Sequence, residues 1–298
     1  MVEVNWKPKF IERYKQLTDI DKFLEYSLKP LTKTIRVNTI KCTVPEMRKR
    51  MKLTPIPWCK EGFGAEGYGL GNTKEHFLGY FYIQGAASMI PPVVLKPKED
   101  DLVLDMCASP GSKTSQMAAM MGNKGLIVAN DLTIDRMQPL TINLQRLGVA
   151  NCVITRMEGA WFKGQLYDKI LLDAPCSGIG TIRKSLKTID MWNPNFSKMM
   201  AGIQRKLFDT AVGVLKEGGS IVYSTCTLEP EEDEGIVDYI LSKHPEMKLE
   251  KIELDIKRGK PVEEFDGKEY TSEVKKCLRI WPHDNDTEGF FVSKFKKA

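Results

Sequence analysis

The chain has 298 residues, of which 42% are hydrophobic and 28% charged, so it can bury the core of one large domain or two modest ones. Its apolar runs all fall short of the ~18 residues that a membrane-spanning helix needs, and its first residues lack the apolar stretch of a secretory signal. We therefore expect a globular protein with no membrane partner, located in the cytoplasm, or in the nucleus or nucleolus of a eukaryotic cell.

Cysteine and histidine usage disfavours two further classes. The seven cysteines are odd in number and form no CxxC pair, and the three histidines are widely separated. Neither a disulfide framework nor a metal site is indicated, and most of the cysteines are expected to be buried free thiols.

Positive charge is concentrated at the front of the chain. Residues 1–60 contain 14 Lys and Arg against 6 Asp and Glu, a net charge of +8, and because the whole chain carries +5 the other 238 residues carry −3. Such a basic segment is typical of a protein that binds a polyanion. A solvated helical surface would give the same excess, so charge alone does not decide between the two.

The first part of the chain predicts a small α+β unit. Apolar and charged residues alternate at helical spacing over 8–28, a strand-like run follows at 33–40, and a helix-like run lies at 44–51. We assign residues 1–78 to this basic N-terminal module and residues 79–298 to a second, larger domain.

From residue 101 on, strand-like and helical patterns alternate. The expected strands are 101–106, 125–131, 152–158, 168–174 and 219–226. Strands separated by helices predict an α/β fold with a parallel sheet covered on both faces, and extended runs at 247–254 and 289–297 would complete seven strands. Ligands of such sheets bind beyond the carboxyl ends of the strands, so the candidate site residues are sought there.

The first of these strands runs into a tight turn and a helix start, "DMCASPGSKTSQM". Gly111 would let the backbone approach a ligand, and the N–H groups at the helix start would face it. The phosphate loop of ATP-binding proteins requires glycine where this chain has Cys107 and Ser112, and the dinucleotide pattern GxGxxG is absent. The sequence therefore disfavours ATP and NAD.

Two acids stand at the ends of the second and third strands. Asp131 lies 20 residues after Gly111, about where such folds place a carboxylate for ribose hydroxyls, and Glu158 lies within reach of an adenine edge. Either acid alone is more simply explained as a helix cap or a solvated carboxylate, but together they favour a nucleoside. S-adenosylmethionine fits best, because its amino-acid tail needs backbone donors and no phosphate site.

Two cysteines follow the fourth and fifth strands, in "LLDAPCSG" and "SIVYSTCT". If these two strands are neighbours in the sheet, about 4.8 Å apart, then Cys176, Cys226 and the carboxylate of Asp173 can approach one ligand. A pair of buried structural cysteines is the alternative, but it does not explain why both follow strands at the same edge of the sheet.

These segments together resemble a known family. "LDMCASPGSKT", "LLDAPCSG" and "VYSTCTLEPEEDE" are similar to the Sun-family RNA cytosine-5 methyltransferases, which include tRNA and rRNA enzymes. The resemblance implies a Rossmann-like, seven-stranded S-adenosylmethionine-dependent methyltransferase domain behind an RNA-contacting module. We expect a monomer that acts on tRNA rather than rRNA, because no long basic extension or extra recognition domain is visible. Phe81, Tyr82 and Trp281 are candidates for stacking on bases, although core packing would explain each of them.

The resemblance also implies the site residues. Cys226, Cys176 and Asp173 would be catalytic, with Asp173 between the cofactor and the target base. The cofactor would be held by Cys107, Ala108, Ser109, Pro110, Gly111, Ser112, Lys113, Asp131, Arg136, Glu158 and Asp173. The chain departs from the usual pattern at Ser109, Ser112, Glu158 and Asp233, where the family has Ala, Gly, Asp and Asn.

The chemistry explains why such residues are needed. Carbon 5 of cytosine is a poor nucleophile until a thiolate adds to carbon 6, and Asp173 would assist by binding ring nitrogen 3. DNA cytosine-5 methyltransferases attack with a cysteine that follows proline, which nominates Cys176, whereas the resemblance nominates Cys226 for attack and Cys176 for release. Physical reasoning permits either. A non-catalytic RNA-binding or assembly factor is disfavoured by the two cysteines, and a small-molecule methyltransferase by the basic front module.

Overall fold

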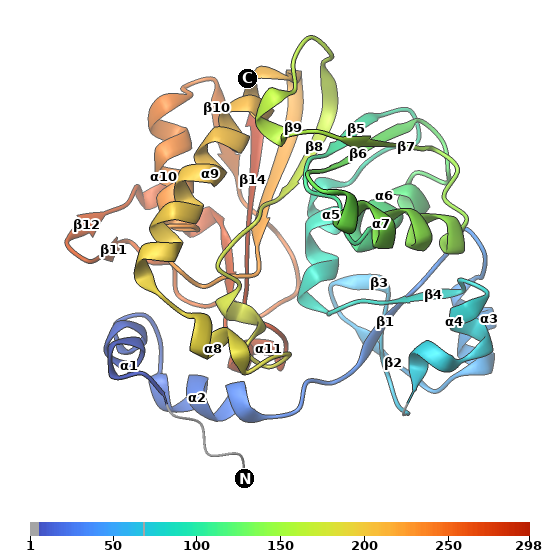
Figure 1. Cartoon of the computed structure of the whole chain (residues 1–298), viewed down its shortest axis with the longest axis horizontal. Coiled ribbons are helices and arrows are strands. Elements are labelled where there is room, and N and C mark those ends of the chain that lie inside the picture. The colour runs from blue at the N-terminus through green and yellow to red at the C-terminus, as the bar shows by residue number, and fades with distance from the viewer. Residues whose placement is uncertain (1–5, 68) are drawn as a thin grey trace.

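The larger part of the chain folds around one eight-stranded sheet (Figure 1). The computed structural model describes residues 6–67 and 69–298. The strands of this sheet are β5 (Leu102–Asp105), β6 (Leu126–Asp131), β7 (Cys152–Arg156), β8 (Tyr167–Asp173), β9 (Leu215–Thr225), β10 (Met247–Glu250), β13 (Leu278–Ile280) and β14 (Phe290–Lys297). Their order is β10-β14-β9-β8-β5-β6-β7, with β13 paired to β14. The strands β5 to β9 run parallel and β14 runs antiparallel to β9.

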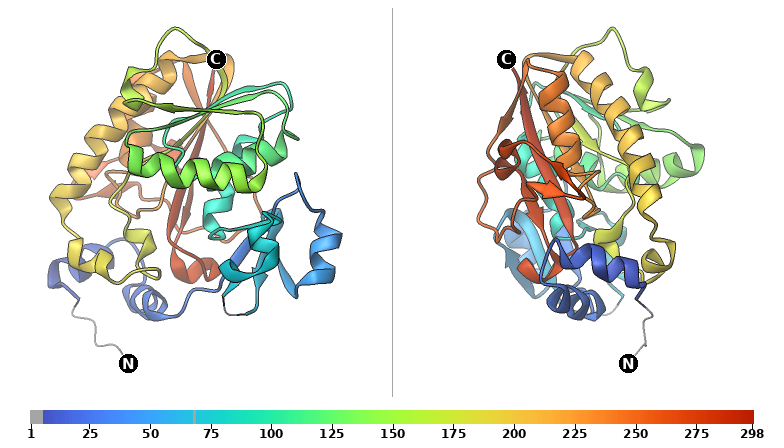
Figure 2. Two further views of the ribbon diagram at one scale, coloured as in Figure 1. Left: turned by 45° about the vertical axis from the view of Figure 1, so that its right-hand side comes forward. Right: turned by 90° about the vertical axis from the view of Figure 1, so that its left-hand side faces the viewer.

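Helices cover both faces of this sheet, as expected from the alternation of strands and helices (Figure 2). They are α5 (Ile90–Leu95), α6 (Ser112–Met120), α7 (Ile134–Leu147), α9 (Pro194–Gly213) and α10 (Glu234–Lys243). Successive strand residues point to opposite faces, so Leu104 and Leu172 pack with α9 and α10, whereas Val103 and Leu171 pack with α5 and α6. The predicted α/β fold with a mostly parallel sheet is confirmed, and β13, which pairs with β14, is an eighth strand beyond the seven that were expected.

The front of the chain forms a second, antiparallel sheet of four strands in the order β2-β3-β1-β4. Its elements are β1 (Thr34–Val37), α3 (Val44–Arg50), β2 (Leu53–Ile56), β3 (Cys59–Ala65), α4 (Lys74–Phe77) and β4 (Phe81–Ile83). The division expected after residue 78 leaves β4 outside this module, yet β4 pairs with β1 through Ile35 and Ile83. The backbone of β1 is therefore hydrogen-bonded on both of its edges.

The helical pattern over 8–28 forms two helices, α1 (Pro8–Lys15) and α2 (Ile20–Leu28). They separate before Asp19, whose side chain accepts a hydrogen bond from the backbone N–H of Lys22 and so begins α2. Both helices pack away from the small sheet. Phe10 meets Trp192 edge-on, with ring centroids 5.2 Å apart, and Phe23 meets Trp281 at 5.5 Å. Figure 1 shows α1 to the left of α8 and α2 beneath α8 and α11, at the carboxyl-end side of the large sheet.

The remaining elements are short. They are α8 (Lys187–Met191), α11 (Pro282–Asn285), the β11 (Glu264–Phe265) and β12 (Lys268–Glu269) hairpin, and the 3-10 turns η1 (Leu70–Asn72), η2 (Ala87–Met89), η3 (Gly159–Trp161), η4 (Ile179–Thr181) and η5 (Ser272–Lys276). In the described part of the chain, every helix is too short or too polar to cross a membrane.

Candidate active site

The two cysteines that follow neighbouring strands lie in contact. Strands β8 and β9 pair in parallel with Asp173 opposite Ser224, so the chain leaves both strands at the same edge of the sheet. Cys226 directly follows β9 and Cys176 lies three residues beyond β8. Their sulfur atoms are 3.4 Å apart, and both cysteines are free thiols. The expectation that both would reach one place therefore agrees with the geometry.

The surroundings of the two thiols differ in charge. The pKa of Cys226 is lowered, first because Cys176 donates a hydrogen bond to its sulfur and further because Lys113 and Lys184 lie near, although burial and Asp173 oppose the shift. The pKa of Cys176 is raised well above its ordinary value by the same hydrogen bond and by burial. Cys226 is therefore the sulfur that carries a thiolate more readily, with Cys176 as its hydrogen-bond donor.

Asp173 and Lys113 form an ion pair beside Cys226. Asp173 accepts hydrogen bonds from the Ser224 hydroxyl through Oδ1 and from Lys113 Nζ through Oδ2, both at 2.7 Å. Lys113 also donates to the Ser88 hydroxyl at 3.0 Å. Burial lowers the pKa of Lys113, but the Asp173 carboxylate outweighs it and the net shift is upward. The last residue of the expected cofactor loop thus directs its ammonium group toward the thiols.

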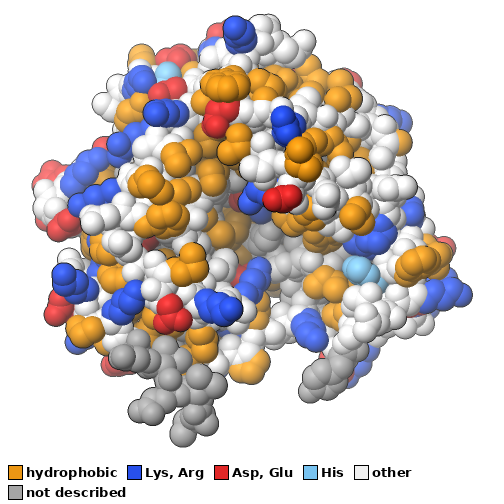
Figure 3. All heavy atoms as spheres, in the orientation of Figure 1, with side chains coloured by type: hydrophobic (Ala, Val, Ile, Leu, Met, Phe, Trp, Pro, Cys, Tyr) orange, Lys and Arg blue, Asp and Glu red, His pale blue; other side chains and the backbone are white. Residues whose placement is uncertain are grey.

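A cavity of about 270 Å³ opens beside these groups. Its lining includes Tyr82, Lys113, Asp173, Lys184, Cys226 and Phe290. Lys184 forms an ion pair with the buried Glu288 at 2.6 Å at this cavity. The face of the molecule seen in Figure 1 is hollowed near its centre, with basic and acidic side chains at the rim of the hollow (Figure 3). We call the cavity of about 270 Å³ the thiol cavity.

A second cavity, of about 550 Å³, lies over the ends of β6 and β7. Asp131 and Glu158 both line it, as expected for carboxylates at successive strand ends. Asp131 accepts hydrogen bonds from the Ser109 N–H at 2.9 Å and from Arg136 Nε at 2.7 Å. Cys107 lines this cavity and also the thiol cavity, so the two meet at the loop after β5. We call the second one the nucleoside cavity.

The loop 107–113 mostly faces the thiol cavity. Ala108, Ser109, Pro110, Ser112 and Lys113 line it, whereas only Cys107 of the loop borders the nucleoside cavity. Gly111 has a φ of +94° and begins α6, and a Cβ there would meet Leu140 Cδ1 at 3.0 Å. The loop therefore spans the passage between the cavities. An elongated ligand could therefore reach from one cavity into the other along this loop.

One residue that supports the site, Arg36, was not found by sequence reasoning. Arg36 in β1 is buried and donates to the Ser112 carbonyl at 2.7 Å and to the Ser115 hydroxyl at 2.9 Å, which ties the front module to the start of α6. A charged residue within the apolar pattern of "TIRV" was the available signal. Of the aromatic candidates, Tyr82 lines the thiol cavity, while Phe81 and Trp281 are packed in the core.

The described residues also bear on metal binding. Within 6–67 and 69–298, no group of three or more His, Cys, Asp or Glu side chains is arranged to hold a metal ion.

We expect the Cys226 thiol to react with iodoacetamide at a lower pH than an ordinary cysteine, because Cys176 stabilises its thiolate. Replacing Cys176 by Ala removes the donor and should shift the midpoint of the rate–pH curve upward, whereas Cys176→Ser keeps a hydroxyl donor and should shift it less. Peptide mass spectrometry follows Cys226, with Cys152, whose pKa burial raises to about 12, as the internal reference. An unchanged midpoint in Cys176→Ala would show that the neighbouring thiol has no such effect.

Two family models together match almost the whole chain. The model described as 16S rRNA methyltransferase RsmB/F matches residues 92–296, and the N-terminal domain of 16S rRNA methyltransferase RsmF matches residues 7–86. A tRNA (cytosine(49)-C(5))-methyltransferase of Pyrococcus abyssi is 45% identical to this chain, over 97% of this chain and 96% of its own length. A ribosomal RNA small subunit methyltransferase F of Shewanella piezotolerans is 42% identical over 94% of this chain, which spans 60% of that relative.

Solved structures agree with these matches. A methyltransferase homologue from Pyrococcus horikoshii has a TM-score of 0.88 and 36% identity, covering 99% of this chain and 96% of its own. The structure of NSun6 from the same organism with SFG has a TM-score of 0.84 and 27% identity, covering 98% of both chains. The resemblance stated from the sequence is confirmed. The chain belongs to the RsmB/F family and is an RNA methyltransferase that uses S-adenosylmethionine.

Proposed function

We propose that this protein, an RNA cytosine-5 methyltransferase by its family, acts on tRNA through a covalent bond between Cys226 and the target cytosine. The observation that carries the assignment is the contact of two free thiols, 3.4 Å apart, of which Cys226 lines the thiol cavity together with the Lys113–Asp173 pair. A fold retained only for RNA binding needs neither a perturbed thiol nor a second thiol as its donor.

In the proposed first step, the Cys226 thiolate adds to carbon 6 of the cytosine and raises the electron density at carbon 5. The added negative charge falls on the ring, whose nitrogen 3 must take up a proton, and Asp173 in its protonated form would donate that proton and become the carboxylate that pairs with Lys113. Lys113 sits against Asp173 and keeps that carboxyl group in place. The sulfonium methyl group of S-adenosylmethionine is the electrophile that carbon 5 attacks when the cofactor is bound.

In the proposed second step, Cys176 removes the proton from carbon 5, and the bond between carbon 6 and Cys226 then breaks. The contact of the two sulfur atoms at 3.4 Å favours this order, because the hydrogen bond to Cys226, together with burial, raises the pKa of Cys176 while Cys226 is free. Once Cys226 has become a thioether, the effect of that hydrogen bond is removed and Cys176 ionises more easily. The base therefore becomes available after the nucleophile has been used.

Cofactor roles follow from the two cavities. We assign Asp131 to the ribose hydroxyls and Glu158 to the adenine edge, with Arg136 orienting Asp131 from the rim. Residues 107–113 would pass the amino-acid tail toward the thiol cavity, where Asp173 lies between cofactor and base. The serines at 109 and 112 and the glutamate at 158, which depart from the family pattern, do not block either cavity.

The RNA would enter over the carboxyl ends of the strands with its cytosine turned out of the stack. The front module, extended to include β4, would supply phosphate contacts from its basic residues, and Tyr82 lies where it can stack on a base. We favour tRNA because the tRNA enzyme of Pyrococcus abyssi matches this chain over 96% of its own length. We propose that the protein is a monomer and acts in the cytoplasm.

Replacing each of the two cysteines by alanine should stop the reaction at a different step. Cys226→Ala should bind RNA and cofactor but form no adduct and no 5-methylcytosine, because carbon 5 is never activated. Cys176→Ala should attack and transfer the methyl group, then remain attached to the RNA as a denaturation-resistant complex. Unmodified tRNA transcripts run with each variant on a denaturing gel distinguish the two.

The reverse pattern, with a trapped complex only for Cys226→Ala, would exchange the roles of the cysteines. The product of the wild-type enzyme is mapped by bisulfite sequencing of total RNA after incubation with cofactor. Protected cytosines in small-subunit rRNA and none in tRNA would overturn the choice of substrate.

S-adenosylmethionine at a hundredfold excess over its dissociation constant should add about 2.7 kcal/mol to the free energy of unfolding, and ATP or NAD should add nothing. Asp131→Ala should lose most of this stabilisation, because the ribose contact and the partner of the Ser109 N–H disappear together. Thermal shift measurements with each ligand test both expectations, and Glu253→Ala, on the exposed surface, is the control variant. Stabilisation by ATP alone would contradict the cofactor assignment.

Neutralising the last turn of α3 should weaken RNA binding. Arg48, Lys49 and Arg50 are all exposed, and replacing them by Gln should lower affinity for unmodified tRNA and reduce the salt slope of log K by up to about 3. The matched control replaces Lys268, Lys275 and Lys276 near the β11–β12 hairpin, which lies at the opposite side of the molecule in Figure 1. Equal losses of RNA affinity in both triple variants would mean that RNA binding depends on the total positive charge of the protein and not on the position of these residues.

A further inference from the structure

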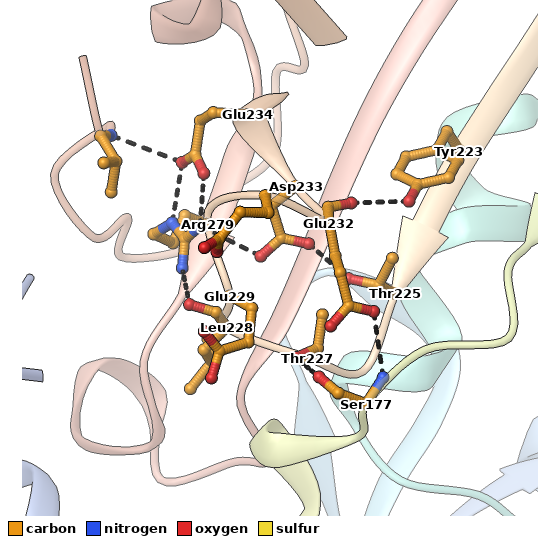
Figure 4. Close-up of polar contacts among 12 residues, drawn as sticks. Ser177, Tyr223, Thr225, Thr227, Leu228, Glu229, Glu232, Asp233, Glu234 and Arg279 are labelled. Atoms are coloured by element: carbon orange, nitrogen blue, oxygen red, sulfur yellow. Dashed lines mark hydrogen bonds and ion pairs between the residues drawn. The ribbon is translucent and has the colours of Figure 1, made fainter. Parts of the chain in front are cut away.

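The carboxyl group of Glu232 is buried against the loop that carries Cys176 (Figure 4). Its Oε2 accepts a hydrogen bond from the backbone N–H of Ser177 at 3.0 Å, directly after Cys176. The same oxygen accepts a hydrogen bond from Gln204 Nε2 at 2.8 Å. In the sequence this residue stood in an acidic run that reads as the solvated start of a helix, so its contact with the catalytic loop was not foreseen.

Gln204 extends this contact to the other side of the cysteine. Its Nε2 also donates to the carbonyl of Pro175 at 2.9 Å, so the residues before and after Cys176 are both held. The Ser177 hydroxyl in turn lies 2.7 Å from the Thr227 hydroxyl, which directly follows Cys226. One buried carboxylate and one buried amide therefore fix the position of the Cys176 loop relative to the Cys226 loop.

Glu232 is itself held rigidly. Its carbonyl accepts a hydrogen bond from the Tyr223 hydroxyl at 2.6 Å, and its neighbour Asp233 accepts one from the Thr225 hydroxyl at 2.6 Å. Tyr223 and Thr225 belong to β9, the strand that Cys226 directly follows. The clamp on the Cys176 loop is therefore anchored on the strand that positions the other thiol (Figure 4).

The acids around Glu232 have different partners. Asp233 and Glu234 pair with Arg279, and Glu229 pairs with Arg13. Among the residues that the structure describes, no lysine or arginine forms an ion pair with Glu232, and its Oε1 has no hydrogen-bond partner. Burial raises the pKa of Glu232 to about 7, an unfavourable setting for a carboxylate. Within the described part of the chain, Glu232 is buried without a positively charged partner and accepts a hydrogen bond from the loop that carries Cys176. Its role is therefore not to form an ion pair.

We propose that Glu232 is a positioning residue for Cys176, which holds the 175–177 loop so that the Cys176 thiol stays beside Cys226 and can act in product release. This inference rests on the proposed roles of the two cysteines. It assigns the effect to release because Cys226 directly follows β9 and its carbonyl accepts a hydrogen bond from the Gly180 N–H at 2.9 Å. Cys176 lies beyond the end of its strand and depends on the clamp.

The test compares Glu232→Ala with Glu232→Gln, using unmodified tRNA transcripts and methyl-labelled cofactor on a denaturing gel. Glu232→Ala should accumulate the methylated adduct several-fold above wild type, while Glu232→Gln, which keeps an oxygen acceptor for the Ser177 N–H, should stay near wild type. Adding Glu232→Ala to Cys176→Ala should not change the trapped fraction further, because the residue acts only through Cys176.

Glu229→Ala is the matched control. Glu229 is equally buried in the same segment, but it bonds to Tyr14, Trp192 and Arg13 and not to the Cys176 loop. We expect this variant to melt at a lower temperature without accumulating adduct. Where Glu232→Ala does not fold, Gln204→Ala removes the bond to Pro175 and should give the same accumulation to a smaller extent.

A folded Glu232→Ala protein with the adduct level of wild type would overturn the proposal, and so would any further change in the trapped fraction when Glu232→Ala is added to Cys176→Ala. Should Glu232→Ala not fold, a folded Gln204→Ala without accumulation would also overturn it. Failure of the cysteine assignment is seen separately, because Cys176→Ala would then trap no complex whatever residue occupies position 232.

Discussion

The parallel pairing of β8 with β9 is the constraint on which the site depends. With Asp173 opposite Ser224, the backbone hydrogen bonds of two adjacent strands bring the chain out of the sheet at one edge and place two sulfur atoms 3.4 Å apart. A slip of one residue would turn every side chain of β9 to the opposite face of the sheet, with Tyr223 and Ser224 exchanging sides. The order of the strands also brings the ends of β5, β6 and β7 to this edge, which explains why the nucleoside cavity and the thiol cavity meet at Cys107.

The basic side chains Lys113 and Arg279 each lie beside a side chain of opposite charge at this edge of the sheet. Lys113 is nearly buried, yet the Asp173 carboxylate keeps it protonated, and its positive charge favours the Cys226 thiolate in a region where water screens little. Behind the thiols, Arg279 is buried with Asp233 and Glu234, and its pKa is raised because these acids outweigh the effect of burial. Arg279 supplies the countercharge that the buried acids Asp233 and Glu234 require. Breaking one partner of such a pair leaves an uncompensated buried charge, at a cost of about 3–5 kcal/mol.

Local pattern predicted the strands and the residues at their ends, because alternation along each strand and the turn residues after it are written within a few positions of one another. The adjacency of Cys176 and Cys226 followed from the usual strand order of such sheets. Contacts between distant segments could not be predicted in this way. Lys113 was assigned with the cofactor loop, and its ammonium group lies against Asp173. The pairing of β4 with β1, the placement of α1 against Trp192, and the clamp formed by Glu232 depend on tertiary packing, to which helical or strand periodicity gives no access.

The front module packs directly against the edge of the sheet that carries the two thiols, so the two parts of the protein are not structurally independent. Tyr14 and Arg13 of α1 both bind Glu229, three residues after Cys226, and Arg36 of β1 binds the Ser112 carbonyl in the loop between the cavities. Each contact is buried or partly buried and joins segments more than 70 residues apart. A displacement of the front module by RNA would therefore act directly on the loop that follows Cys226 and on the 107–113 loop. In the proposed mechanism the module that binds the substrate is also part of the support of the nucleophile, so removing it would damage the site as well as the RNA contacts.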